Sequence, residues 1–331
     1  MTGDLSAEIR SVLGSMLKGR ESSRDFDRPL WKDLSETGFH LLGVPEEIGG
    51  SGGGLGELAV AVDSIAFHTA GAPLVESAFL AGWLLTKANL RVPGGLVVAS
   101  LDEAHCGSAS RLSGRLRVPW ARHADQVVTI AKDADEVLVA VVPARGLEVV
   151  RAENLAGEPR DTLVLDDVVA TVMAPVDVDA ADLLRRGALA RSIQLAAAAR
   201  AVLETTQRHV GEREQFGRPL ARFQAVQQHL AALAAEVTAM NVSADAAVLA
   251  DDDVATAAAK ATTSAGAHTV AAIGHQLHGA LGYSREHHLG AVTTRLWSWR
   301  EEFGNESHWQ DQLADAVRAD SWWPLITGGA R

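Results

Sequence analysis

The sequence contains a single cysteine, Cys106, among its 331 residues. One thiol cannot form an internal disulfide framework, which argues against a secreted protein held together by disulfides. We therefore expect Cys106 to be a small buried or loop residue and not a nucleophile. The N-terminal residues 1–14 also lack the basic and apolar regions of a signal peptide. Together these absences predict a cytoplasmic location.

Long apolar runs and an excess of basic residues are missing as well. Although 47% of the residues are hydrophobic, no run approaches the ~20 apolar residues that cross a bilayer, so no membrane span is expected. The net charge of −12 argues against binding of nucleic acid, because phosphate groups are recognised by clusters of lysine and arginine. No metal site is expected either, because the histidines at 275, 278, 287 and 288 follow no zinc-ligand spacing.

The chain divides into three regions with different hydrophobic periods. Residues 1–92 repeat apolar residues at helical spacing and predict an N-terminal helical domain. Residues 93–180 contain short β-branched runs at intervals of 8–14 residues and predict a central antiparallel β-barrel or sandwich. Residues 181–331 return to the helical period over four long, alanine-rich segments and predict a four-helix bundle. The predicted fold class is therefore α+β with three domains.

Three sequence stretches carry a family resemblance. They read WKDLSETGFHLLGVPEEIGGSG at 31–52, REQFGRPLARFQAVQQHLA at 213–231 and HQLHGALGYSREHHL at 275–289. In their order and in the helix, strand, helix layout around them, they resemble the acyl-CoA dehydrogenase family. The shortened β region is similar to that of actinobacterial-type members, which assemble from two different chains and often act on bulky steroid thioesters.

The resemblance implies a cofactor, FAD, that lies between the β domain and the bundle while a neighbouring subunit contacts its pyrophosphate. Five positions match the flavin-contacting residues of the family: Arg213, Phe216, Gln224, Gln276 and Gly279. An arginine beside a Phe-Gly turn suits this role, because its planar guanidinium can bind a diphosphate through two hydrogen bonds. One departure from the family motif is Ala280, which stands where its second glycine is expected.

The resemblance also implies a reaction, the α,β-dehydrogenation of an acyl-CoA thioester with an electron-transfer acceptor for the reduced flavin. Such a reaction needs a base for the α-proton. Counted from Tyr283, the glutamate that serves most family members falls on Phe303, and the place used by some relatives falls on Gly187. The usual base is therefore absent, and Glu302 is the nearest candidate.

Several interpretations of Glu302 stay open at the level of sequence. A helix running through Phe303 would place that residue on one face with Trp299 and would turn Glu302 about 100° away. Desolvation by the neighbouring aromatic rings would raise the pKa of Glu302 and suit a base. Alternatively, Glu302 is solvated or paired with Arg300 or Arg295. Glu301 and Glu306 are further candidates for the base, and the last alternative is that this chain contains no base.

Three functional hypotheses follow. The first is an FAD-dependent acyl-CoA dehydrogenase or a subunit of one, forming a homo-oligomer or a heterotetramer with a second acyl-CoA dehydrogenase-like chain. The second is a partner subunit that keeps the fold but supplies no base. The third is an enzyme of this fold with altered chemistry. Trp120 is interpreted either as the tryptophan that covers the flavin in relatives or as a residue of the β-domain core.

Overall fold

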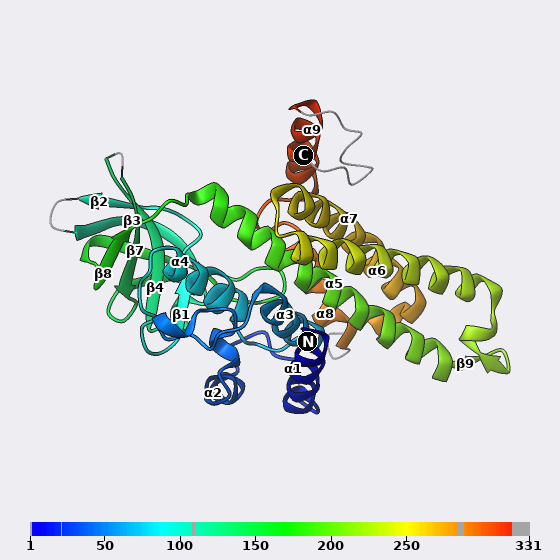
Figure 1. Ribbon diagram of the computed structural model, residues 1–331. Coiled ribbons are helices and arrows are strands. Elements are labelled where there is room, and N and C mark those ends of the chain that lie inside the picture. Colours follow the sequence, from blue (N-terminus) through cyan, green and yellow to red (C-terminus); the bar gives the residue numbers. More distant parts are fainter. Residues whose placement is uncertain (1, 21, 108–109, 135, 284–287, 320–331) are drawn as a thin grey trace. The chain divides into compact units, whose positions relative to one another are not determined.

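The computed structural model describes residues 2–20, 22–107, 110–134, 136–283 and 288–319. It contains two compact units, residues 1–190 and 191–331 (Figure 1). The change from helix to strand falls between residues 87 and 97, and the change back falls between 175 and 180. Both changes lie close to the domain boundaries that the sequence predicts, although the three-domain division itself remains a prediction.

The first unit begins with a group of short helices. They are α1 (Thr2–Leu17), α2 (Arg28–Glu36), α3 (Leu55–Phe67), a π-helical segment (Val75–Gly82) and α4 (Trp83–Lys87). The Asp27 side chain accepts a hydrogen bond from the Leu30 amide at 2.9 Å and caps α2. Before α3, the chain turns so closely at Gly50 that a β-carbon there would lie 2.1 Å from the Val44 carbonyl oxygen. The glycine-rich stretch is therefore a tight connector before a helix.

The same unit contains a sheet of eight strands. They are β1 (Val97–Ala99), β2 (Ala104–Gly107), β3 (Arg111–Pro119), β4 (Gln126–Asp133), β5 (Glu136–Pro143), β6 (Glu148–Val150), β7 (Arg160–Val169) and β8 (Val172–Pro175). Their order is β6-β7-β3-β2-β4-β5-β8, and β1 also pairs with β4. The hydrophobic runs of β4 and β5 are buried along Val127–Ala131 and Leu138–Val142, which explains their almost continuous apolar sequence.

The sheet is mixed, whereas the sequence predicted antiparallel pairing throughout. Strands β1 and β2 both run parallel to β4, and the remaining pairs are antiparallel. The two strands follow one another along the same edge of β4 and are separated by a bend at Ser100–Asp102. The Ser100 hydroxyl donates to the Asp102 carbonyl at 2.8 Å and holds this bend. The hydrophobic period contains no information on strand direction, so this pairing was not visible in the sequence.

The second half of the chain is helical. It contains α5 (Ala180–Glu212), a hairpin of β9 (Glu214–Gln215) and β10 (Arg218–Pro219), α6 (Gln224–Ala250), α7 (Asp253–His278), α8 (His288–Trp299) and α9 (Glu306–Ala319). Helices α6 and α7 are antiparallel because only Asp251 and Asp252 separate them. A β-carbon on Gly266 of α7 would lie 2.7 Å from the Met240 sulfur of α6, so these two axes approach closely. The predicted helical bundle is confirmed, with α9 as an additional short helix.

Helix α6 is the one described helix whose length and apolar composition would suffice to cross a membrane. Its apolar residues lie on two faces of the helix. Leu233, Val237 and Met240 are buried and lie on the side of α7. The opposite face is exposed and is considered below as an assembly surface.

Candidate functional site

The segment from the end of α5 to the first residue of α6, which includes the β9–β10 hairpin, carries three of the five positions that resemble flavin contacts. Its turn consists of Phe216 and Gly217, which both have left-handed backbone angles, and the Leu220 amide donates to the Arg213 carbonyl at 2.9 Å. The ring of Phe216 is 92% exposed, and Arg213 and Gln224 are exposed as well. Phe216 is therefore available on the surface of the single chain.

The C-terminal end of α7 brings the other two positions to the same end of the bundle. Because α6 and α7 are antiparallel, residues 276–279 lie beside the first turn of α6. The ring of His278 on α7 stacks on that of His209 on α5, with centroids 4.4 Å apart. The backbone of Gly279 has φ 59° and ψ −143°, which an L-residue with a side chain rarely adopts. The exposed residues Gln276 and Gly279 thus join the hairpin at one surface.

This surface has the donors that a flavin dinucleotide would require, namely a guanidinium group, two side-chain amides and an exposed aromatic ring. Arg213, Gln224 and Gln276 would hold the polar part of the cofactor, and Phe216 would cover an apolar part. All five residues are exposed in the single chain. The surface is therefore open in the single chain.

The second site of interest is the loop between α8 and α9, which contains the predicted base. Helix α8 ends at Trp299, and Phe303 and Gly304 have φ angles of 56° and 83°. The helix therefore does not continue through Phe303. A left-handed phenylalanine followed by glycine reverses the chain, so the i and i+4 relation of Trp299 and Phe303 does not apply.

Glu302 is paired with a residue that sequence reasoning missed. The Arg191 guanidinium on α5 donates to the Glu302 carboxylate through Nε and Nη2, both at 2.8 Å. Arg191 is only 1% exposed, and its guanidinium carbon lies 5.4 Å from the centroid of the Phe303 ring. The expected partner was Arg300 or Arg295. Arg191 could have been found in the sequence as the single charge in the apolar segment around it. A buried arginine requires a carboxylate or carbonyl partner.

The other two acidic candidates lie at the edge of the loop. The Arg300 guanidinium contacts the carboxylates of Glu301 at 3.2 Å and Glu306 at 3.6 Å. The Glu301 side chain is 57% exposed, so this ion pair contributes little to stability. The structure thus separates Glu302, held against a buried arginine, from its two more exposed neighbours. The assignment of Glu302 as the base stays a prediction.

A buried lysine, Lys260 of α7, contacts the same loop and was not predicted. Its Nζ donates to the carbonyl oxygens of Arg300 at 2.9 Å and Gly304 at 2.7 Å, and to the Ser264 hydroxyl at 2.9 Å. Burial, and then the positive charge of Arg191, lower the pKa of Lys260 to about 7. The sequence could have drawn attention to Lys260, because no other lysine or arginine occurs between Arg222 and Arg285.

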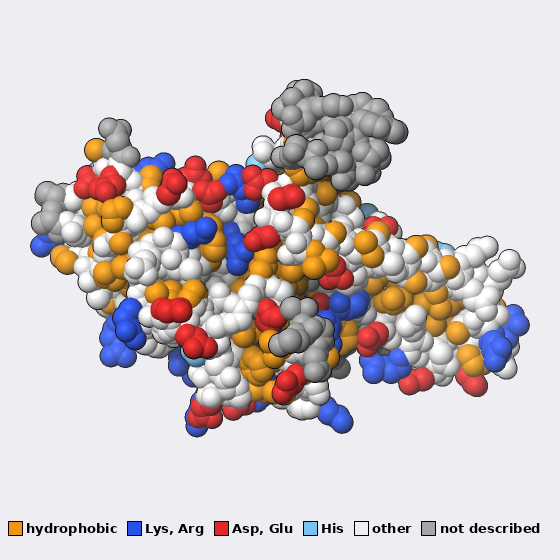
Figure 2. All heavy atoms as spheres, viewed as in Figure 1, with side chains coloured by type: hydrophobic (Ala, Val, Ile, Leu, Met, Phe, Trp, Pro, Cys, Tyr) orange, Lys and Arg blue, Asp and Glu red, His pale blue; other side chains and the backbone are white. Residues whose placement is uncertain are grey.

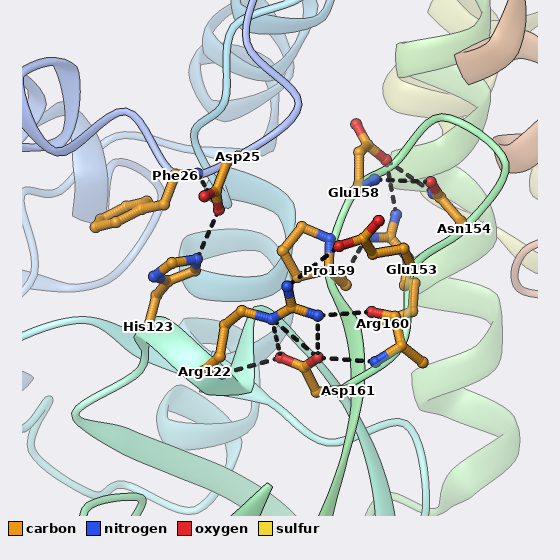
Figure 3. Close-up of polar contacts among 11 residues, drawn as sticks. Asp25, Phe26, Arg122, His123, Glu153, Asn154, Glu158, Pro159, Arg160 and Asp161 are labelled. Atoms are coloured by element: carbon orange, nitrogen blue, oxygen red, sulfur yellow. Dashed lines mark hydrogen bonds and ion pairs between the residues drawn. The ribbon is translucent and has the colours of Figure 1, made fainter. Parts of the chain in front are cut away.

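A third cluster lies in the first unit and connects the segment before α2 with the sheet (Figure 3). Asp161 of β7 is fully buried, and both of its oxygens accept hydrogen bonds from Arg122 at distances between 2.7 and 3.1 Å. Beside this pair, His123 Nε2 lies 2.7 Å from the Asp25 carboxylate. A hydrogen bond from the Phe26 amide is the main cause that lowers the pKa of Asp25. The network is well satisfied, and we interpret it as structural.

Two residues singled out in the sequence lie within the core of the first unit. Trp120 is 4% exposed, which favours its interpretation as a core residue. Cys106 is 3% exposed, which confirms that it is buried. Burial, and then the charge of Asp133, raise the pKa of the Cys106 thiol.

We expect Cys106 to react at least tenfold more slowly in the native protein than in the denatured chain with a thiol reagent that releases a coloured product. The absorbance of that product measures the rate of reaction.

Comparison with known proteins gives the class to which this fold and these motifs belong. Residues 8–88 match the model of the acyl-CoA dehydrogenase N-terminal domain, and residues 179–314 match that of the acyl-CoA dehydrogenase C-terminal domain. The chain therefore belongs to the acyl-CoA dehydrogenase family. The named members of this family are oxidoreductases that act on CH–CH bonds.

Particular relatives cover most of the chain. It is 29% identical over 273 residues to the acyl-CoA dehydrogenase IpdE2 of Mycobacterium tuberculosis, covering 81% of this chain and 80% of the relative. A chain of the ChsE4–ChsE5 complex of Mycobacterium tuberculosis is 22% identical with a TM-score of 0.84, covering 96% of this chain and 97% of that chain. A chain of the steroid ACAD Tcur3481–Tcur3483 is 25% identical with a TM-score of 0.81 and the same coverage. These similarities confirm the predicted fold.

Proposed function

We propose that the chain is a subunit of an FAD-dependent acyl-CoA dehydrogenase, in which a second chain completes each flavin site. When bound, FAD would accept the hydride from the β-carbon of the acyl group, and an electron-transfer acceptor would reoxidise it. The observation that carries the proposal is the exposure of all five predicted flavin contacts at one end of the bundle. Residues that hold a cofactor in an open surface need a further surface to enclose it.

The separation of the two candidate sites supports this arrangement. Helix α5 connects Arg191, at the loop with Glu302, to Arg213, at the flavin hairpin. At 1.5 Å per residue these two arginines lie roughly 33 Å apart along the helix. We infer that the loop and the hairpin serve two different active sites in adjacent subunits. Both relatives with solved structures named above are complexes of two named chains, which agrees with such sharing.

We further propose that the second chain supplies the base. Phe303 stands where the family motif places its glutamate, and Glu302 is already engaged by Arg191 through two hydrogen bonds. To take a proton from the substrate, Glu302 would have to release a buried guanidinium, which is costly. This inference favours the subunit that completes a heteromeric dehydrogenase over the enzyme that works alone.

Purification of the chain with and without a second acyl-CoA dehydrogenase-like chain tests this proposal. Alone, the protein is expected to be colourless and to show no acyl-CoA oxidation. Together with the partner it is expected to bind flavin, which gives a visible absorption spectrum, and to reduce an artificial electron acceptor. If the chain without a partner binds flavin and turns over acyl-CoA, the heteromeric proposal is contradicted. Glu302 then becomes the leading candidate for the base.

The exposed face of α6 is the proposed assembly surface. Eight exposed residues repeat along it at alternating spacings of three and four: Ala225, Gln228, Ala232, Ala235, Ala239, Val242, Ala246 and Leu249. This is the pattern of a coiled-coil seam, and none of the eight is charged. Figure 2 shows hydrophobic side chains gathered over the part of the bundle that carries α6. Val242 and Leu249, the two largest apolar side chains of this row, are 62% and 86% exposed.

The order of residues in this seam favours an antiparallel partner helix. A two-fold axis at Val237 would place each seam alanine beside a seam residue of the opposite helix. The four layers would be Ala225 with Leu249, Ala232 with Val242, Ala239 with Ala235, and Ala246 with Gln228. Small residues facing larger ones allow two helices to approach closely. Either a second copy or a related chain with the same pattern would satisfy this geometry.

Substitution of Val242 by glutamate tests the assembly surface. A charge in the middle of the seam would be buried without a partner, so we expect the oligomer to dissociate with at least a hundredfold weaker association. Light scattering after size exclusion measures the mass of the purified chain and of its mixture with the second chain. The matched control is Gln227→Glu, which adds the same charge on α6 outside the seam. Unchanged mass for Val242→Glu would exclude α6 as the interface.

A further inference from the structure

The starting observation is that Lys260 is completely buried although it lies on a helix of a protein with abundant exposed surface. Lysine is rarely buried unless its ammonium group is fully hydrogen-bonded. Here Nζ lies within hydrogen-bond distance of three oxygens, those of Ser264, Arg300 and Gly304. An ammonium group can donate to all three, and a neutral amine can donate to the two carbonyl oxygens and accept from the Ser264 hydroxyl. The Ser264 hydroxyl in turn lies 3.2 Å from the Arg300 carbonyl. This is a constructed site, since two residues one turn apart on α7 are directed at the same loop.

The two backbone contacts of Lys260 join the beginning and the end of the loop. Arg300 is the first residue after α8, and Gly304 follows the left-handed Phe303. One Nζ atom therefore joins the carbonyl oxygens at the two ends of a turn of five residues. Between them, the Trp309 indole of α9 donates to the Phe303 carbonyl at 2.9 Å.

The charges around Lys260 come from the elements packed against α7. Arg191 on α5 carries a like charge, as does Arg300 in the loop, and both lower the pKa of Lys260. Glu302 and Glu301 in the loop carry opposite charges and raise it. Because Glu302 also binds Arg191, the loop is held by one buried cation through its main chain and by a second through its side chain.

We propose that Lys260 is a positioning residue that fixes residues 300–304, and with them Glu302 and Phe303, in the orientation that the acyl-CoA site requires. The proposal rests on the function proposed above. It assigns no contact between Lys260 and the substrate. Its consequence is that the loop opens and closes with a proton, since Lys260 is solvated when the loop is open and buried when it is closed.

The direction of this coupling follows from the pKa. In the closed state the pKa of Lys260 is about 7, and in an open, solvated state it returns toward 10.5. The open state therefore binds more protons between these values, and the closed state gains stability as the pH rises from about 7 toward 10.5. Below pH 7 both states carry the proton, and the coupling disappears. The opening equilibrium changes by up to tenfold for each pH unit within this window.

Hydrogen exchange of the loop amides tests the proposal without any assay of activity. The amides of Glu301 and Glu302 donate to the carbonyls of Ser298 and Trp299, so opening of the loop exposes them. In the complete chain, Lys260→Met is expected to accelerate their exchange at least tenfold. The increase of protection with pH, after correction for intrinsic exchange, should also disappear. The matched control is Thr263→Val, on the same helix and equally buried, whose hydroxyl donates within α7 to Ala259.

A second variant covers the possibility that Lys260→Met does not fold. Ser264→Ala removes one of the three oxygens and keeps the lysine, and is expected to accelerate exchange about threefold. Loop protection in Lys260→Met or Ser264→Ala that equals the Thr263→Val control at every pH would overturn the positioning role.

Turnover of the flavin-loaded assembly separates the two proposals. If both hold, Lys260→Met lowers kcat about tenfold or more with unchanged flavin content and altered pH dependence, while Thr263→Val does not. If the loop responds as expected but no assembly oxidises acyl-CoA, the proposed function fails and the proton-linked loop stands. If turnover is present but the exchange and pH dependence of Lys260→Met match those of the control, the positioning role fails alone.

Discussion

Arg213→Gln is expected to weaken flavin binding by the complete assembly by one to two orders of magnitude. Arg213 is exposed in the single chain, so its removal leaves the fold unchanged. A guanidinium bound to a diphosphate makes charge-assisted hydrogen bonds worth about 1.5–3 kcal/mol each, which glutamine cannot replace. The ratio of flavin to protein after gel filtration, and a titration of the apoprotein with FAD, measure the loss. The assembly should keep its mass throughout.

The matched control for this prediction is Arg218, which lies on β10 of the hairpin that follows Arg213. Arg218 is also exposed, but its guanidinium carbon lies 4.1 Å from the centroid of the Phe223 ring and is stacked within the hairpin. Arg218→Gln is expected to change flavin affinity less than threefold. Equal losses in both variants would show that general positive charge, and not Arg213 itself, attracts the cofactor.

Asp161→Ala is expected to lower the free energy of unfolding by about 3–5 kcal/mol. The substitution removes a fully buried carboxylate and leaves Arg122, whose side chain is 13% exposed, without its principal partner. It also removes the acceptor for the amides of Arg122 and Ala152. Chemical denaturation followed by circular dichroism measures the change, which should appear as a lower midpoint.

Glu153→Ala provides the matched control because Glu153 pairs with the same guanidinium. Its carboxylate lies 3.3 Å from Arg122, and its side chain is 55% exposed. An exposed pair contributes about 0–1 kcal/mol, so the control should unfold almost as the parent chain does. A loss for Asp161→Ala no larger than that of Glu153→Ala would show that water reaches Arg122 and compensates for the missing carboxylate.

The architecture was predictable because hydrophobic period and family motifs agree. The helical period of residues 1–92 and the long alanine-rich segments after 180 correspond to the observed helices. The β-branched runs after 93 correspond to strands, but their periods contain no information on direction, so the parallel pairs of β1 and β2 with β4 were missed. The end of α8 at Trp299 could not be located from the sequence, because residues 300–302 have ordinary helix propensities and the reversal occurs at Phe303.

The candidate site was predictable only in part, for a physical reason. Positions such as Arg213 and Gly279 belong to short motifs, so the sequence could nominate them, and their role as flavin contacts stays a prediction. Arg191 and Lys260 act on residues that are 111 and 40 positions away. Arg191 binds a carboxylate, and Lys260 binds two main-chain carbonyl oxygens. Because every residue has a main-chain carbonyl, the sequence does not single out the partners of Lys260. A sequence shows that an isolated charge in an apolar helix must find an acceptor, and only the fold shows which one.

The contacts that hold the loop after α8 do not depend on which side chain residue 303 carries. The hydrogen bonds from Lys260 and Trp309 end on main-chain oxygens, which are present whatever side chain stands there. Residue 303 can thus be exchanged while the frame around it persists. Along a lineage, a carboxylate at this point can be lost or regained without rebuilding the scaffold. A duplicated gene can in this way give rise to one chain that performs chemistry and a sister that only completes the enclosure.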